Sequence, residues 1–459
     1  MSQARFLEGN LFRHVTVMSL TSSVGLMAIF AVDFVDMIFI SMLGKDELAA
    51  AIGYAGAILF FTTSFNIGVA IAAGALVAQA LGAGEKERAR QRAANALTAG
   101  FLFAAEFELG VWLSLIGASG VTHELAVLYL ASIVPTLPIL LLGMAGGAIL
   151  RAHGDARRAM MSTIVGGIVN AVLDPILIFG LDLELTGAAL ASAISRVAIA
   201  VYALAPIIRY HGGLSLPHPL QLFRDLPPVS AIALPAILTQ LATPVGQAWV
   251  TRSMAEFGED AVAGMAVIGR MTPLAFATIF ALSGAVGPIA GQNYGAGRFD
   301  RVRETLRDAL LFTALVVGVA ALTLYMLRAP IVRLFDADGM ALTLIYLFCG
   351  PLALVFFFNG ILFVSNAFFN NLGRPFYSTW MNWGRHTLGT IPFVWLGGTY
   401  LGAPGVLIGQ AAGGIVFGLL ALVLVRQVVR DVEDHPVQPK GPGIFQRQAR
   451  QVILFFSRR

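Results

Sequence analysis

Two polar side chains lie inside an otherwise apolar stretch, "VNAVLDPILIFG", at residues 169–180. Asn170 and Asp174 are four positions apart, so on a helix they share one face, a turn apart. A carboxylate at bilayer depth costs several kcal/mol and usually has a functional reason to be there. Pro175 follows directly, and because it has no N–H it leaves the carbonyl of Ala171 without a helical partner. An amide, a carboxylate and a carbonyl are groups that bind a proton or a hard cation such as Na⁺.

Two residues from other apolar stretches are expected at the same depth. Asp36 lies 8 residues before the end of the first stretch, Asp174 lies 6 before the end of the fifth, and Ser192 lies about 7 after the start of the sixth. At a rise of about 1.5 Å per residue these positions are level in the outer half of the bilayer. We therefore interpret Asp36, Asn170, Asp174 and Ser192 as a site for H⁺ or Na⁺. Asp33 is a further candidate, because it can share the face of Asp36.

A structural role is the alternative for each charged residue in these stretches. A buried Asp can serve only as a hydrogen-bond acceptor that joins helices. Glu106 and Glu108 point to roughly opposite faces of one helix, and one of them can pair with Arg196. We expect Arg270 and Arg385 to bind backbone carbonyls or neighbouring groups rather than substrate.

The composition explains how such residues are positioned. Of the 459 residues, 57% are hydrophobic and 12% are charged, whereas a soluble domain has about 25% charged residues. Stretches of about 20 apolar residues cross a bilayer as helices. We predict an all-α integral membrane protein with twelve such spans, near 14–43, 48–80, 93–117, 124–150, 158–180, 185–210, 228–254, 260–290, 306–328, 340–364, 376–397 and 402–426.

The basic residues predict the orientation. Loops that follow even-numbered spans contain Lys86, Arg88, Arg90, Arg92, Arg151, Arg157, Arg158, Arg209, Arg224, Arg298, Arg301, Arg303, Arg307 and Arg374, while the other loops contain only Lys45, Arg252, Arg328 and Arg333. This excess marks the cytoplasmic side. Both termini are then inside, and the basic balance reflects topology rather than nucleic-acid binding. We predict a cytoplasmic N-terminus (1–13) without a cleavable signal and a basic cytoplasmic tail (427–459) at the membrane surface.

An internal repeat divides the spans into two halves. "DELAAAIGYAGAIL" (46–59) resembles "EDAVAGMAVIGRMT" (259–272), and at the same offset of 213 "AQALGAGEKERAR" (78–90) resembles "GQNYGAGRFDRVR" (291–303). We predict two pseudo-symmetric six-helix lobes, 14–210 and 228–426, joined by a cytoplasmic loop at 211–227. Parallel repeats of this kind are typical of transporters that work by alternating access.

The acids do not follow the repeat. The first half has Asp33, Asp36, Glu106, Glu108 and Asp174 within its spans, whereas the second half has acids only at the ends of its spans, Asp260 and Asp308. The asymmetry assigns the cation site to the first lobe. No glycine-rich phosphate loop with its Lys and Ser/Thr is present, and the single cysteine, Cys349, excludes an internal disulfide and a cysteine-rich metal site.

These motifs resemble a known family. "FVDMIFISMLG" (34–44), the two loop signatures above, "LRAHGDARRAM" (150–160) and "VNAVLDPILIFG" are similar to motifs of multidrug and toxic compound extrusion (MATE) transporters, and most similar to the DinF-like branch. The resemblance covers about 14–426. It implies that Asp36, Asn170, Asp174 and Ser192 couple transport to H⁺ and/or Na⁺, and that amphipathic, often cationic, compounds are exported.

We therefore expect a cation-coupled antiporter in the cytoplasmic membrane of a prokaryote. Its expected partners are small-molecule organic substrates and membrane lipids, it is a monomer, and it has no tightly bound cofactor. The alternative within the superfamily is a lipid-linked sugar or lipid flippase, which tends to have a cationic cavity and extra helices. A membrane-embedded enzyme is the alternative from another class, but neither a nucleophile nor a His accompanies Asp36 and Asp174.

The orientation can be tested by thiol labelling. In a Cys349→Ser background, a cysteine that replaces Glu124 should react with a membrane-impermeant maleimide in intact cells. A cysteine that replaces Lys86 should react only after permeabilisation, because the charge bias places it inside. The reverse pattern would overturn the orientation.

Overall fold

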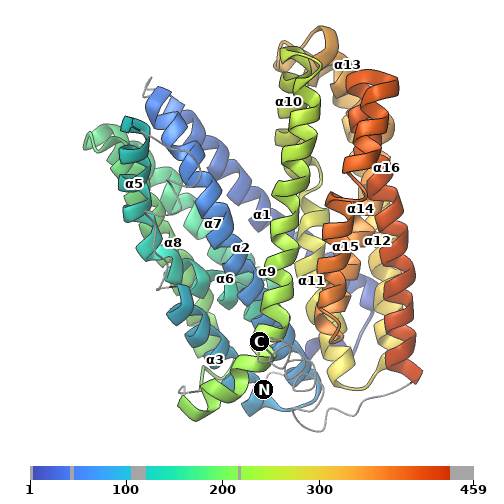
Figure 1. Cartoon of the computed structure of the whole chain (residues 1–459). Helices are drawn as coiled ribbons and strands as arrows, with labels where there is room; N and C mark the ends of the chain where they lie inside the picture. The colour runs from blue at the N-terminus through green and yellow to red at the C-terminus, as the bar shows by residue number, and fades with distance from the viewer. Residues whose placement is uncertain (1–3, 42–45, 105–119, 216–218, 435–459) are drawn as a thin grey trace, which may run out of the picture. The chain divides into compact units, whose positions relative to one another are not determined.

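The helices of the predicted spans are present. A computed structural model describes residues 4–41, 46–104, 120–215 and 219–434, and every regular element within these residues is helical (Figure 1). The helices are α1 (Leu11–Ser41), α2 (Asp46–Gly82), α3 (Lys86–Ala104), α5 (Gly120–Ile133), α6 (Leu137–Ala152), α7 (Ala156–Pro175), α8 (Glu184–Tyr210), α9 (Pro219–Ala255), α10 (Glu259–Ala275), α11 (Ala277–Gly295), α12 (Phe299–Leu334), α13 (Gly339–Leu347), α14 (Ala353–Asn371), α15 (Phe376–His386) and α16 (Ile391–Asp434), with short turns η1 (Arg5–Leu7), η2 (Val134–Thr136), η3 (Ile176–Gly180) and η4 (Phe348–Leu352).

These helices match the predicted membrane spans closely. In the described residues, nine helices or helix pairs are long and apolar enough to cross a bilayer, and the bent pair α10 and α11 makes a tenth. The last of the nine, Phe376–Asp434, contains two spans, because α16 reverses direction at Gly402. The third predicted span, 93–117, extends beyond Ala104 into residues outside the described part.

The chain forms two compact units. Among the described residues, unit 1 consists of residues 4–5 and 24–237, and unit 2 of residues 6–23 and 238–434. The core of unit 1 is rich in alanine where α2, α3 and α6 meet, and the α2 backbone at Gly74 approaches Ala148 closely. Small residues at such crossings let helices pack tightly in a membrane, where burial from water gives little driving force. Unit 2 uses larger side chains, including Phe276 and Phe356, whose stacked rings lie 3.9 Å apart.

Several spans are interrupted rather than continuous. We predicted one span over 260–290, but α10 and α11 are bent by 45° at Phe276. Pro273 explains the break, since it has no N–H to donate to the preceding turn. The predicted span 340–364 likewise contains the π-turn η4, where Gly350 leaves helical geometry before Pro351.

Glycines hold the last two spans against each other. At Gly402 the chain adopts φ 65° and ψ −150°, a conformation that suits glycine, and it then runs back along itself. A Cβ at Gly405, Gly409 or Gly413 would overlap the backbone of Gly397, Phe393 or Gly389 respectively. The backbones of the two spans are therefore in direct contact along three successive turns.

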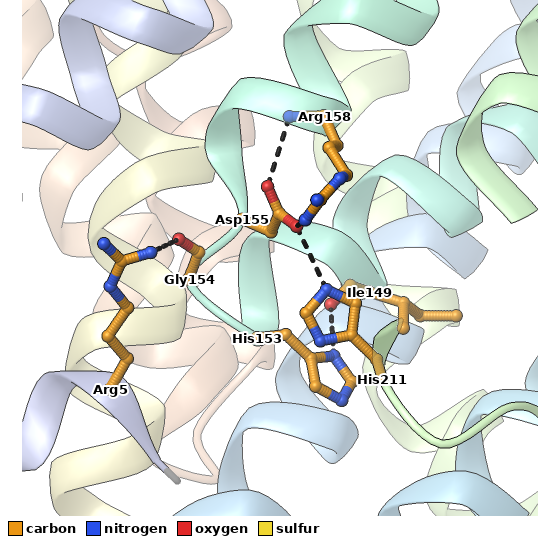
Figure 2. Close-up of polar contacts among 7 residues, drawn as sticks. All are labelled: Arg5, Ile149, His153, Gly154, Asp155, Arg158 and His211. Carbon is orange, nitrogen blue, oxygen red and sulfur yellow. Dashed lines mark hydrogen bonds and ion pairs between the residues drawn. The ribbon is translucent and has the colours of Figure 1, made fainter. Parts of the chain in front are cut away.

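The C-terminal ends of α6 and α8 and the N-terminal end of α7 share a polar cluster (Figure 2). The Asp155 carboxylate caps α7 by accepting from the Arg158 backbone N–H at 3.3 Å, and its Oδ2 lies 3.1 Å from Nε2 of His211, just beyond α8. The His211 ring contacts that of His153, with centroids 4.5 Å apart and the ring planes tilted by 40°. His153 donates from Nδ1 to the Ile149 carbonyl at 2.9 Å, so one cluster ties together the ends of three helices.

Burial has opposite consequences for two members of this cluster. Desolvation lowers the pKa of His153 to about 4. Desolvation raises the pKa of Asp155, but hydrogen bonds from His211 and Arg158 outweigh it and lower that pKa to about 2. His153 is therefore neutral and Asp155 is charged at neutral pH.

Replacing Gly413 should destabilise the protein much more than replacing its neighbour Gly414. A Cβ at Gly413 overlaps the Gly389 carbonyl, whereas a Cβ at Gly414 would have its nearest neighbour at 3.7 Å. Overpacking of this kind costs about 1–3 kcal/mol or more. Thermal unfolding in detergent should show a clearly lower Tm for Gly413→Ala and a near-native Tm for Gly414→Ala. Equal melting of the two variants would contradict the close packing.

Acid should weaken the folded state through His153. Its pKa is about 4 when folded and near 6.5 in the unfolded chain, so between these values the unfolded state binds more protons. Stability should therefore fall as the pH drops from about 6.5 to about 4, by about 1.4 kcal/mol per pH unit at most. His153→Gln should flatten this dependence in Tm measurements across the window, while His14→Gln, at an exposed contact with the Glu8 carbonyl, serves as the matched control. An unchanged slope in His153→Gln would refute this account.

Candidate functional site

Asn170 and Asp174 lie together in the interior of unit 1. Both are on α7, and Asn170 Nδ2 donates to Asp174 Oδ2 at 2.7 Å. Only 5% of Asn170 and 1% of Asp174 is exposed. α7 ends at the next residue, Pro175, and the chain continues as the π-turn η3. A charge-assisted hydrogen bond thus lies beside a change in helix geometry, where backbone carbonyls lose their regular partners.

The packing of α8 against α7 places Ser192 at this level. Ser195 Oγ donates to the Gly166 carbonyl at 2.8 Å, and a Cβ at Gly187 would touch the Leu177 backbone at 2.7 Å. The helices are antiparallel, so interpolation between these two contacts puts Ser192 opposite Asn170. Ser192 is partly buried.

The packing of α1 against α7 places Asp36 at the same level. A Cβ at Gly167 would lie 3.0 Å from the Val32 side chain, and the rings of Phe39 and Phe179 are in edge contact at 6.0 Å. Asp36 lies between Val32 and Phe39 on α1, so its backbone is level with Asp174. The side chains of Asp33 and Asp36 lie outside the described part of the structure, as do Glu106 and Glu108.

The geometry therefore brings three helices of unit 1 to one level, each with an oxygen-bearing residue of the predicted site. Asp and Asn on α7, Ser on α8 and Asp on α1 are residue types whose oxygens suit a proton or a hard cation. Cation binding at these residues stays a prediction.

Arg196 lies one turn after Ser192 on α8 and has a structural role. Its Nη1 donates to the Ile133 carbonyl at 3.0 Å and to Thr136 Oγ1 at 2.6 Å, which ties α8 to the turn η2. A buried guanidinium is tolerated in a membrane when it is bonded in this way. Whether a glutamate also pairs with it lies outside the described residues.

Unit 2 contains a polar interior that sequence reasoning missed. Asn382 Nδ2 donates to Asn366 Oδ1 at 3.2 Å, and Ser378 Oγ donates to Asn370 Oδ1 at 3.3 Å. All four residues are buried between α14 and α15. The signal was the spacing of four within each pair, 366 with 370 and 378 with 382, which puts each pair on one helix face.

We expected Arg385 to bind a backbone carbonyl or a neighbouring group. In the part of the chain that the structure describes its guanidinium has neither a hydrogen-bond acceptor nor an ion-pair partner, so this expectation stays a prediction. Arg270, on α10, is exposed.

Comparison with known proteins identifies the family. The MatE family model matches residues 22–176 and again residues 235–396, once in each half, which agrees with the internal repeat. The chain is 27% identical to a FAD transporter of Shewanella oneidensis over 91% of its own length and 94% of that protein. It is 23% identical to the multidrug export protein MepA of Staphylococcus haemolyticus, over 92% of its own length and 94% of that protein.

A solved structure shows the same fold. The crystal structure of the MATE transporter VcmN of Vibrio cholerae superposes with a TM-score of 0.86, covers 92% of this chain and 97% of its own, and is 24% identical in sequence. Two matches to one family model, over more than half of the chain, agree with the all-helical spans and the repeat. The chain belongs to the multidrug and toxic compound extrusion (MATE) family of membrane transporters.

Proposed function

We propose that this transporter exports organic compounds in exchange for entry of H⁺ or Na⁺, and that the cation binds in unit 1 at Asp36, Asn170, Asp174 and Ser192, with Asp33 as a further carboxylate. The observation that carries the proposal is the bond from Asn170 to the fully buried Asp174, next to the break at Pro175. A carboxylate at this depth is costly, and ionisable residues within membrane spans commonly mark ion or substrate paths.

Coupling follows from the electrostatics of two carboxylates at one level. Two charged carboxylates at one level repel each other, so a proton or Na⁺ shared between Asp36 and Asp174 would stabilise the pair. Loss of that proton, or entry of Na⁺, changes the local charge by about one unit. At an effective dielectric constant of about 20, one charge acting at about 4 Å is worth about 4 kcal/mol.

That energy is enough to shift a two-state equilibrium. A change from a 1:99 to a 99:1 ratio needs about 5.5 kcal/mol, so a single charge accomplishes most of it. One arrangement of α1 binds substrate and the other binds the cation. Mutual exclusion of the two is the requirement for antiport.

The relatives suggest two substrate classes. The name of the Staphylococcus haemolyticus protein supports amphipathic drugs, which are often cationic. The Shewanella oneidensis protein, whose name specifies FAD, supports an aromatic compound that carries phosphate. The second class is also favoured by Arg385 in unit 2, for which no described residue supplies an acceptor, and by the absence of Asp and Glu from 309–335 and 339–430.

We assign the protein to the cytoplasmic membrane of a prokaryote as a monomer in contact with membrane lipids, with both termini in the cytoplasm. The loop charges support the orientation, and the spans support a multi-pass protein.

The coupling site is tested in proteoliposomes with ΔpH and ΔNa⁺ imposed separately. Asp36→Asn should abolish gradient-driven efflux. Asp174→Asn should still bind substrate, but the dependence of binding on pH or Na⁺ should be lost, because the group that titrates is gone. Substrate flux and equilibrium binding are the two measurements.

Asp308→Asn is the matched control. Asp308 is a buried carboxylate of unit 2 that pairs with Arg307 at 3.1 Å, near the inner end of α12. This variant should keep ion-dependent transport if it folds. Wild-type ion dependence in Asp174→Asn would mean that Asp174 only joins helices.

A further inference from the structure

The eleventh span is interrupted near the middle of the bilayer. α15 ends at His386 and α16 begins at Ile391, with turns between them. The interruption is stabilised by a wide turn, in which the Gly389 N–H donates to the Gly384 carbonyl at 2.8 Å. Arg385 lies about 14 Å along the span from Phe376, which is about half of the hydrocarbon thickness. Discontinuous spans at this depth are where transporters commonly bind their substrates.

Arg385 is a partly buried cation for which the described residues supply no acceptor. Arg196, about equally deep in unit 1, makes two hydrogen bonds, whereas Arg385 has no acceptor among the described residues. The sequence explains part of this difference, because 261–299, 309–335 and 339–430 contain neither Asp nor Glu. The membrane surface is too far for the side chain to reach. A charge at such a position almost always faces the protein interior or an aqueous path, and it needs a counter-charge.

His386 adds a second donor at the same place. Only 6% of it is exposed, and the ring packs so closely on α9 that a Cβ at Gly246 would overlap its Nδ1. The described residues provide no hydrogen-bond partner for its ring nitrogens. Arg385 and His386 are adjacent on the last turn of α15, with their side chains about 100° apart around the helix axis.

The rest of α15 is fixed in place. Asn382 is bonded to Asn366 and to the Ser378 carbonyl, and Trp383 Nε1 donates to the Leu238 carbonyl at 2.9 Å. Arg385 and His386 are therefore held on a rigid turn by neighbours whose own hydrogen bonds are satisfied. Such preorganisation lowers the cost of binding a ligand.

We propose that Arg385 and His386 form an anion-binding site in unit 2 that receives the phosphate or carboxylate of an amphipathic aromatic substrate. A guanidinium binds these planar or tetrahedral anions through paired hydrogen bonds. This inference rests on the proposed export function and specifies one substrate class for it. The cation site of unit 1 and the anion site of unit 2 are then separate and can be tested separately.

The experiment measures binding by the purified full-length protein in detergent without any ion gradient. FAD, FMN and riboflavin serve as probes that share one ring system, of which riboflavin lacks phosphate, and ethidium serves as a cationic probe. Arg385→Gln should raise the Kd for FAD and FMN roughly tenfold to a hundredfold, the effect of losing one hydrogen-bonded charge pair. It should leave the Kd for riboflavin and ethidium within about twofold. Arg385→Lys should recover part of the loss because it keeps the charge.

Arg270→Gln is the matched control, since Arg270 is an exposed membrane arginine of the same unit, and it should bind all four probes like the wild type. Tm values of every variant show whether it is folded, and Arg385→Lys supplies the test if Arg385→Gln does not fold. Anionic phosphatidylglycerol that displaces FMN from the wild type, with no transport of FMN in vesicles, would assign the site to a lipid phosphate. Absence of such competition supports a soluble substrate.

Two results would overturn the anion site. One is equal affinity for FAD and FMN in the wild type and Arg385→Gln, and the other is wild-type protein that binds ethidium but neither nucleotide. Because binding is measured without an ion gradient, the result does not depend on ion coupling in unit 1. Conversely, intact coupling with no effect of Arg385 would reject the anion site alone.

Discussion

The hydrogen bond between Asn170 and Asp174 shows the constraint on which this protein depends: a polar group in the bilayer needs a partner. Asp174 has an amide donor one turn away, Arg196 has a carbonyl and a hydroxyl, and the asparagines of α14 and α15 bond to one another. Each of these bonds also fixes the register of a helix or of a helix pair. Arg385 differs from these residues, because the described residues give its guanidinium no acceptor, and this difference is the basis of the anion site proposed above.

Each of the two units has an interrupted helix in its fifth span, at a different depth in the bilayer. In each, the fifth span is interrupted directly beyond its ionisable residues, at Pro175 in unit 1 and at residues 387–390 in unit 2. An interruption releases backbone groups from regular helical bonding and changes the direction of the side chains that follow. The break therefore lies at roughly corresponding positions in the two halves. The residue beside it is acidic in unit 1 (Asp174) and basic in unit 2 (Arg385).

Much of this architecture could be predicted because it depends on properties averaged over many residues, such as hydropathy. Hydropathy over about 20 residues predicts the spans, and an offset of 213 predicts the repeat that the two family matches confirm. Spacing of four predicts that Asn170 and Asp174 share a face. Window averages miss the bend at Phe276 and the reversal at Gly402, because these depend on single residues, Pro273 and Gly402, rather than on a sum. The amide network of unit 2 escaped notice because neutral Asn and Ser differ little from their surroundings in such an average.

The glycine contacts of the last two spans have a consequence for biosynthesis. Residues 389–401 expose bare backbone at Gly389, Phe393 and Gly397 until Gly413, Gly409 and Gly405 cover it. In lipid, neither segment can cover this backbone with its own side chains. We therefore expect the two segments to be stable in the bilayer only as a hairpin that turns at Gly402. We therefore expect the eleventh span to be unstable in the bilayer by itself during synthesis. Its stable insertion requires the twelfth span, which the ribosome makes after it.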